Sequence, residues 1–241
     1  MCIRDSPYTA QDWLRYNISK NIKDYIENVN HIYDYIPYNA LDVGCSIGIS
    51  TEFLIKDFPK TQMYGIDLSP YFIGVADYRS SSNNLNIEYV HGNAEKTKFH
   101  SNSFQLIVCN FLFHELPEKA AKTILNELYR ILSDNGVLAI IDMDPSHLDK
   151  QLNNNIFRKW AFESTEPHIY NYYLRNSSTM LRNANFHQVK KIRNDPLNSI
   201  WFGVKRSSEY QSQNVLSNRF KKSLDDLYSD TSEHSFEYEF H

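Results

Sequence analysis

The chain has 241 residues, 41% of them hydrophobic, and a formal net charge of −4 at pH 7. This length is enough to bury the core of one large domain, but no run of ~18 apolar residues occurs that could cross a membrane. The lack of excess positive charge argues against electrostatic capture of nucleic acid. The last segment, 207–241, carries all of the net negative charge, and we expect a disordered tail there because it is rich in Ser, Asn and acidic residues.

The first six residues and the cysteine content bear on the cellular location. Residues 1–6 contain no apolar run that could serve as a signal peptide, and they resemble sequencing-adaptor read-through, so we assign them no function. Three scattered cysteines are too few for a disulfide framework and indicate a reducing compartment. We therefore expect a cytoplasmic protein, and leave a plastid location open in case a transit segment is missing.

Residues 8–36 are predicted to form a helix, because apolar and aromatic side chains recur there with a period close to 3.6. After Asn39 the pattern changes to short apolar runs that alternate with helical segments. The predicted strands of this block are 40–43, 63–68, 87–90, 104–110 and 137–143. The first helix of this block is expected to end before Pro59. The second is expected to begin at Ser69-Pro70 and to stop at the loop 80–86, and the third to begin at Pro117 and to stop at the turn 134–136.

Beyond this block we expect helices near 147–162 and 170–184, and strands near 187–194 and 200–205. A turn at 195–198 would make these two strands antiparallel. Near-continuous apolar strands that alternate with helices indicate a parallel sheet covered on both faces. The pattern therefore predicts an α/β fold with a doubly wound, mostly parallel sheet and an antiparallel last strand.

The first predicted strand leads into the turn Asp42-Val43-Gly44-Cys45-Ser46-Ile47-Gly48-Ile49. A glycine-containing turn that opens a helix at the carboxyl end of a first strand is typical of a nucleotide site. The dinucleotide fingerprint needs glycine at its first, third and sixth positions, but counted from Gly44 the third is Ser46 and the sixth is Ile49. No Gly-Lys-Ser/Thr follows, so the turn is not a P-loop. The turn disfavours an NAD(P)-dependent oxidoreductase, which we keep as a rival.

Gly44 and Gly48 resemble the glycines of motif I in class I S-adenosylmethionine-dependent methyltransferases. The segment 64–70, YGIDLSP, resembles motif II, whose acid accepts hydrogen bonds from both ribose hydroxyls and is Asp67 here. The segment 90–95 occupies the place of the adenine loop. The resemblance implies a Rossmann-like sheet with strand order 3-2-1-4-5-7-6 and S-adenosyl-L-methionine as the cofactor.

The ordered set of motifs resembles a methyltransferase-11-like group that is associated with photosynthetic organisms. The set consists of GCSIGIST at 44–51, DLSPYF at 67–72, FHE at 113–115 and STEP at 164–167. Ser50 replaces the third glycine of the common motif I, and Gln105 stands where an Asp is usual. Neither change removes a chemical group that the reaction needs. Asn93 stands where many relatives carry Asp, but it still offers a side-chain carbonyl to the adenine.

We divide the chain into an N-terminal helical cap at 7–37, the methyltransferase domain at 38–206 and the tail at 207–241. In doubly wound sheets the ligand lies outside the carboxyl ends of the strands where the strand order reverses, which for this order is between strands one and four. The resemblance implies that the cofactor is bound by Asp42, Gly44, Cys45, Gly48, Asp67, Leu68, Asn93, Ala94 and Asn110.

The acceptor end of the site is expected just past the fourth strand, where His114 and Glu115 lie. An acceptor that bears a proton needs a base, and we assign His114 as that base and Glu115 as the group that orients the ring or the substrate. Glu166 and Tyr172 belong to a segment expected to close over the pocket. No metal is expected, because the sequence after His114 lacks the second His of a zinc motif and Pro117 breaks the helix that the motif needs.

These features predict an S-adenosylmethionine-dependent methyltransferase that transfers a methyl group to a small-molecule acceptor. Methyltransferases of nucleobase amino groups usually carry Asn/Asp-Pro-Pro-Tyr/Phe after strand four, whereas this chain has Asn110-Phe111-Leu112-Phe113, so no nucleic-acid substrate is expected. A non-catalytic cofactor-binding protein is the second rival, because intact binding motifs do not prove turnover. The acceptor atom and the oligomeric state stay open.

Overall fold

The computed structural model describes residues 10–29, 37–147 and 156–207. Predictions for the rest of the chain, including the acidic tail beyond residue 207, lie outside the described residues. The chain divides into two units, Met1–Lys205 and Arg206–His241. All helices and strands described below belong to the first unit.

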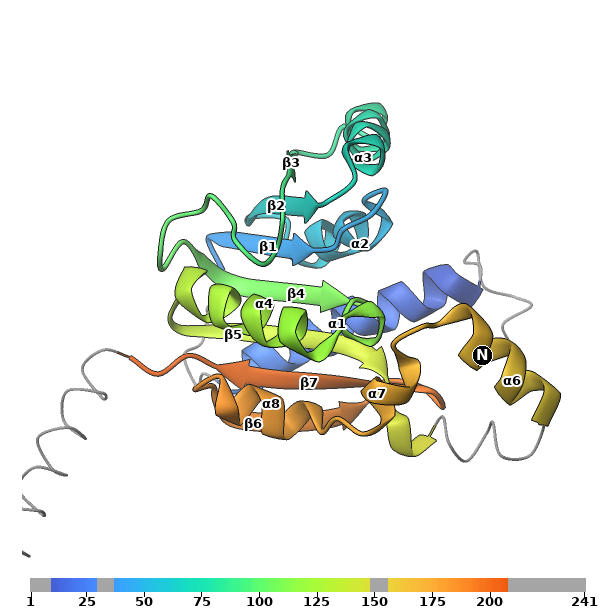
Figure 1. Cartoon of the computed structure of the whole chain (residues 1–241). Coiled ribbons are helices and arrows are strands. Elements are labelled where there is room, and N and C mark those ends of the chain that lie inside the picture. The colour runs from blue at the N-terminus through green and yellow to red at the C-terminus, as the bar shows by residue number, and fades with distance from the viewer. Residues whose placement is uncertain (1–9, 30–36, 148–155, 208–241) are drawn as a thin grey trace, which may run out of the picture. The chain divides into compact units, whose positions relative to one another are not determined.

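Seven strands of the described chain form one sheet with the order β3-β2-β1-β4-β5-β7-β6 (Figure 1). They are β1 Asn39–Val43, β2 Gln62–Asp67, β3 Ile87–His91, β4 Phe104–Asn110, β5 Leu132–Met143, β6 His187–Arg193 and β7 Asn198–Val204. The first five strands pair in parallel, and β7 is antiparallel to both of its neighbours. The predicted Rossmann-like fold and its strand order 3-2-1-4-5-7-6 are therefore confirmed.

The central strands are apolar along most of their length because both faces of the sheet are covered. In β4, all four residues from Leu106 to Cys109 are completely buried. Successive side chains point to opposite faces, so Leu106 and Val108 join the core on one face while Ile107 and Cys109 join the core on the other.

Two groups of helices cover the two faces (Figure 1). α1 Ala10–Val29 and α2 Ile49–Asp57 pack on one face, and α4 Glu118–Ile131, α7 Ile169–Tyr173 and α8 Ser177–Asn183 pack on the other. α3 Pro70–Ser82 packs beside β2 and β3, and the chain also contains α6 Ile156–Thr165 and the short 3₁₀ helix η2 Phe113–Glu115. None of the described helices has the length and apolar character needed to cross a membrane.

α1 packs directly on the sheet. Ile22 is completely buried, and the ring of Tyr25 stacks on the ring of Phe202 in β7 with 3.7 Å between the ring centroids. The helix predicted at 8–36 is therefore confirmed over the described residues of α1. The division of the chain into a cap, a domain and a tail stays a prediction.

Strand β5 begins earlier than the sequence predicts. The turn signal at 134–136 predicts a strand that starts at 137, but β5 starts at Leu132 and includes these residues. Asn135 does adopt a turn-like φ of 61°. Its N–H donates to the carbonyl of Lys205, and the N–H of Lys205 donates to the carbonyl of Gly136, each at 3.0 Å. The turn residues thus gain backbone partners from the chain that follows β7, which no local pattern reveals.

Two predicted helix boundaries are also wrong. The helix expected at 170–184 is split into α7 and α8, because the side chain of Asn176 caps a new helix by accepting from the N–H of Thr179 at 3.0 Å. The loop expected at 80–86 is shorter, since α3 continues into its first residues.

Ile22→Ala is expected to lower the free energy of unfolding by about 2–5 kcal/mol, because it removes buried methyl groups and leaves a cavity between α1 and the sheet. Glu27→Ala, on the exposed side of the same helix, is the control and should change stability by less than about 0.5 kcal/mol. Urea unfolding of the full chain measures both. Equal stabilities of the two variants would contradict a role for α1 in the core.

Candidate active site

A cleft with a volume of about 710 Å³ opens at the carboxyl ends of β1, β2 and β4. This is the place where the strand order reverses and where doubly wound sheets bind their ligands. Among the described residues, its walls come mainly from α1, the turn after β1, the ends of β2 and β4, and the loops after β3 and β4, with one residue each from α2, α3 and α4. Its size is that of a site for small molecules.

The turn after β1 requires glycine at two positions. Gly44 and Gly48 have φ angles of 72° and 80°, which other residues adopt only with strain. The N–H of Gly44 donates to the carbonyl of Ile66 in β2 at 2.8 Å, which holds the turn against the neighbouring strand. A side chain at Gly48 would collide with the hydroxyl of Tyr89. Gly44 lines the cleft, whereas Gly48 is needed for the packing of the turn.

The carboxylate of Asp67, at the end of β2, joins two loops at the cleft. Its Oδ2 accepts from the N–H of Ser46 at 2.9 Å, and its Oδ1 accepts from the N–H of Ser69 at 2.8 Å. Ser69 caps α3 as predicted, because its hydroxyl accepts from the N–H of Phe72 at 3.3 Å. Each carboxylate oxygen can accept more than one hydrogen bond, so Asp67 keeps acceptor capacity for a ligand in the cleft.

The loop after β3 lies beside the end of β2. The N–H of Gly92 donates to the carbonyl of Asp67 at 3.0 Å. Asn93 and Ala94 follow and line the cleft, and the side-chain carbonyl of Asn93 accepts from the backbone N–H two residues further on at 2.8 Å. Leu68, which is 67% exposed, lines the cleft from the end of β2. An amide and two apolar side chains therefore border the cleft near Asp67.

Asp42, at the end of β1, is completely buried. The hydroxyl of Thr51 donates to its Oδ2 at 2.7 Å, and the amide of Asn110 donates to its Oδ1 at 3.4 Å. Burial raises the pKa of Asp42 to about 7, and the two hydrogen bonds offset only part of this rise. Asn110 lines the cleft but Asp42 does not, so Asp42 acts on the site by holding Asn110 and the start of α2.

His114 lies in η2, shortly after β4, and only 6% of its surface is exposed. The completely buried Asp142, near the end of β5, contacts it twice: Oδ2 accepts from the backbone N–H at 3.1 Å, and Oδ1 lies 2.8 Å from Nδ1. Burial lowers the pKa of His114, but the hydrogen bond and charge of Asp142, with the charges of Glu115 and Glu166, outweigh it and raise the pKa above its usual value. Asp142 thus holds the imidazole in one orientation.

Two further carboxylates lie near the other ring nitrogen of His114. Oε1 of Glu115 is 3.8 Å and Oε2 of Glu166 is 4.0 Å from Nε2. Glu115 lines the cleft, whereas His114 lies beside it and is not a lining residue. Sequence reasoning missed Asp142. The sequence does hold a clue to Asp142, because it is an acidic residue near the carboxyl end of the predicted strand 137–143, and the predicted strand order places this strand next to strand four.

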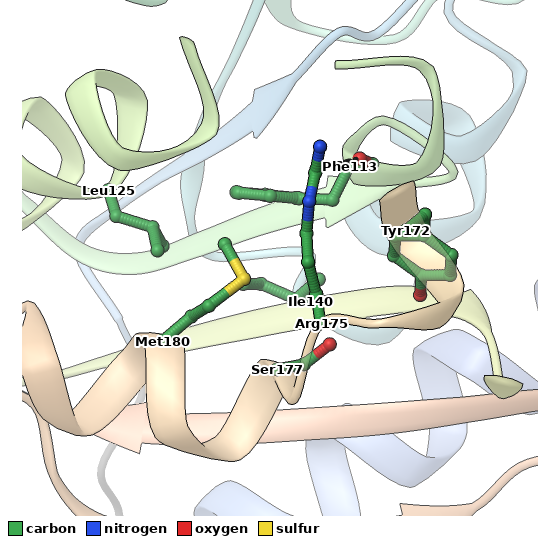
Figure 2. Close-up of a pocket in the computed structure, with 7 residues that line it drawn as sticks. All are labelled: Phe113, Leu125, Ile140, Tyr172, Arg175, Ser177 and Met180. Carbon is green, nitrogen blue, oxygen red and sulfur yellow. Dashed lines mark hydrogen bonds between the residues drawn. The ribbon is translucent and has the colours of Figure 1, made fainter. Parts of the chain in front are cut away.

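The side of His114 that faces α7 is tightly packed. The ring of Tyr172 meets the imidazole edge to face with 6.3 Å between centroids, and its hydroxyl donates to the carbonyl of Met143 at 2.6 Å. Figure 2 shows Tyr172 and Arg175 beside a small pocket, whose volume of about 10 Å³ has room for about one water molecule. This pocket is too small for a substrate, and Tyr172 supports His114.

The structure brings most of the predicted site residues to one cleft. Those that line it are Gly44, Cys45, Asp67, Leu68, Asn93, Ala94, Asn110 and Glu115. Asp42, Gly48 and His114 do not line it, but each contacts a residue that does. Leu14 and Arg15 of α1 also line the cleft, which the sequence does not predict. No local pattern indicates them, because their position depends on how α1 packs on the sheet.

Relatives in sequence are methyltransferases. Residues 40–136 match the family model of a methyltransferase domain. A demethylmenaquinone methyltransferase of Listeria monocytogenes serotype 4a (strain HCC23) is 31% identical over 124 residues, which make up 50% of this chain and 52% of that protein. A second one, from Geobacillus stearothermophilus, is 29% identical over 105 residues, or 43% of this chain and 44% of that protein. The chain thus matches about half the length of these curated relatives.

Solved structures share the fold. A SAM-dependent methyltransferase from Aquifex aeolicus aligns with a TM-score of 0.60 at 20% identity and covers 83% of this chain and 94% of that chain. The plantazolicin methyltransferase BpumL in complex with SAH aligns with a TM-score of 0.60 at 16% identity, over 82% and 86% of the two chains. The fold is therefore that of these solved structures, and residues 40–136 are similar to a methyltransferase domain.

Asp42→Asn is expected to raise the melting temperature more at pH 8 than at pH 5. The pKa of Asp42 is about 7 in the folded chain and ~3.9 in an unfolded one, so the native state loses stability as the pH rises from about 4 to 7. Asparagine has no charge to bury, and its carbonyl still accepts from Thr51. Thermal scans at both pH values measure the effect, with the exposed Asp77→Asn as the control. The same gain at both pH values would contradict a buried charge at this position.

Proposed function

We propose that this chain, in which residues 40–136 match a methyltransferase domain and the sheet has the methyltransferase strand order, is an S-adenosylmethionine-dependent methyltransferase with a small-molecule acceptor. The observation that carries the proposal is that Asp67 and the Gly44 turn line one cleft at the reversal of the strand order. A fixed carboxylate there suits a ligand that offers hydroxyl groups, and the turn lacks the glycines that a pyrophosphate needs.

S-adenosyl-L-methionine supplies a methyl group that is already activated on a sulfonium sulfur. In the proposed arrangement Asp67 accepts hydrogen bonds from the ribose hydroxyls, and Asn93, Leu68 and Ala94 border the adenine. Gly44 faces the methionine part of the cofactor. Hydrogen bonds to an ionised carboxylate are about twice as strong as those between neutral groups, so Asp67 contributes most to the orientation of the ribose.

The acceptor is proposed to lie where Phe111, Leu112 and Glu115 line the cleft, because two apolar side chains and one carboxylate offer both packing and a polar contact. The curated relatives are named for demethylmenaquinone, a small molecule, and we extend only this class of acceptor to the chain. A nucleic-acid acceptor is not proposed, because the acidic and basic residues of 1–206 balance. We also propose a cytoplasmic location and keep the plastid as the alternative.

Methyl transfer from an activated donor depends mainly on the alignment of the acceptor, which can contribute up to ~7–11 kcal/mol. Glu115 is the proposed catalytic residue because it lines the cleft. His114, also predicted as catalytic, lies next to it and is held by Asp142, so it acts through Glu115. Together they handle the proton of an acceptor that bears one.

Two rival functions make different predictions. An NAD(P)-dependent oxidoreductase is disfavoured, because Ser46 and Ile49 stand at the two positions where the dinucleotide fingerprint needs its second and third glycines. A non-catalytic cofactor-binding protein would bind S-adenosylmethionine without turnover. Incubation with methyl-labelled cofactor and a cell metabolite extract, followed by mass spectrometry of labelled products, separates this rival from an enzyme.

Asp67→Ala is expected to weaken the binding of S-adenosylhomocysteine at least tenfold, because two hydrogen bonds to a charged group are lost, each worth about 1.5–3 kcal/mol. Calorimetry on the folded variant measures the affinity. Asp77→Ala removes the same charge from the exposed face of α3 and should leave the affinity unchanged. Wild-type protein that binds NAD more tightly than S-adenosylhomocysteine would refute the proposed function.

His114→Asn is expected to lower turnover at least 10²-fold while the affinity for S-adenosylhomocysteine changes little, because His114 acts through Glu115 at the proposed acceptor end of the cleft. Formation of the labelled product gives kcat and KM, and calorimetry gives the affinity. His100→Asn, at an exposed position outside the cleft, is the control. Full turnover of His114→Asn would show that this histidine has no part in the reaction.

A further inference from the structure

Three side chains from two distant parts of the sequence converge beside the cleft. The ring of His114 and the carboxylates of Glu115 and Glu166 each offer one ligand atom, and these atoms lie within 4.8 Å of one another. Nε2 of His114 is 3.8 Å from Glu115 and 4.0 Å from Glu166, which is too far for a direct hydrogen bond. The spacing leaves room for a positive ion between the three groups.

Asp142 supplies an independent observation that points to the same ligand. Its carboxylate pairs with Nδ1 of His114 at 2.8 Å, so Nδ1 carries a proton and Nε2 is the ring nitrogen that faces the two glutamates. Histidines that bind metals almost always donate their other ring N–H to a carboxylate or carbonyl in this way. His114 is more than nine-tenths buried, so its orientation is held by the fold rather than by solvent.

The surroundings hold one side of this cluster rigid and leave the other open. Tyr172 packs against the imidazole and is itself anchored by its hydrogen bond to the carbonyl of Met143. The side chain of Glu166 is 27% exposed and that of Glu115 is 64% exposed, and Glu115 lines the cleft. An ion at the cluster would therefore be within reach of a molecule in the cleft.

We propose that His114, Glu115 and Glu166 bind one divalent first-row metal ion, with Asp142 as the positioning residue behind the histidine. One imidazole nitrogen and two carboxylate oxygens suit Zn²⁺, Fe²⁺ or Mn²⁺. The three ligand atoms lie within 4.8 Å of one another, and ligands around a tetrahedral zinc ion lie ~3.4 Å apart for bonds of ~2.0–2.1 Å, so side-chain shifts of up to about 1.4 Å bring the three groups to a zinc ion. This site departs from the expectation that the chain binds no metal.

The site deepens the proposed function and rests on it for the choice of acceptor. A three-ligand site keeps at least one position open for a further ligand, and Glu115 lines the cleft from which such a ligand would come. The acceptor class that fits is a small molecule with a hydroxyl or another oxygen donor at the group to be methylated. The ion would orient that oxygen, and a bound cation favours its deprotonated form.

Titration of the untagged, EDTA-treated full chain with ZnCl₂ in a calorimeter, and with MnCl₂ followed by electron paramagnetic resonance, tests the site without any turnover. We expect one ion per chain with a Kd of about 10 μM or tighter for at least one of the two metals. Glu166→Gln should weaken that binding at least tenfold, and Asp142→Asn by about 10–100-fold. Glu118→Gln, an exposed acid that pairs with Lys122, is the control and should bind like the wild type.

Absence of a one-to-one complex with both metals would overturn the site, and so would equal affinities of the wild type and Glu166→Gln. Glu166 is partly exposed, so this variant decides the question even where a change at Asp142 prevents folding. Calorimetry of S-adenosylhomocysteine on the metal-free chain separates the two proposals. Cofactor binding without metal binding refutes only the ion site, and metal binding without cofactor binding refutes only the methyltransferase.

Discussion

The reversal of the strand order between β1 and β4 is the constraint on which the whole site depends. From β1 the chain builds the sheet outward through β2 to β3, and from β4 it builds outward in the opposite direction through β5. Because each parallel crossover is right-handed, α2 falls on one face of the sheet and α4 on the other. The loops after β1 and β4 therefore diverge, and the cleft opens between them.

Buried carboxylates link the strand ends to the residues that surround this cleft. Asp42 at the end of β1 holds Thr51 and Asn110, and Asp142 near the end of β5 holds His114. The two carboxylates differ in their hydrogen-bond partners and in the group whose pKa is shifted. Asp42 receives two hydroxyl or amide hydrogen bonds, and its pKa rises to about 7 because burial outweighs them. Asp142 accepts from the backbone N–H groups of His114 and Met143, and it raises the pKa of the imidazole that it faces.

Much of the fold follows from local patterns. The strand β4 runs over the predicted residues, Ser69 caps α3, and the glycines of the first turn have the positive φ angles that the motif requires. These features depend on a residue and its near neighbours, which is why periodicity and turn chemistry predict them. The start of β5 was predicted wrongly, since the partner of Asn135 is Lys205, far along the chain.

The sequence by itself determined the sheet type, the glycine turn and the acid of β2, because each is encoded within a short stretch of residues. Only the tertiary structure decided that α1 reaches the cleft and that Asp142 and Glu166 meet His114. These side chains lie on segments with no shared local pattern, and the packing of strands and helices brings them together. The same packing puts Glu115 on the cleft surface and His114 beside it, a distinction that two adjacent residues in a sequence do not carry.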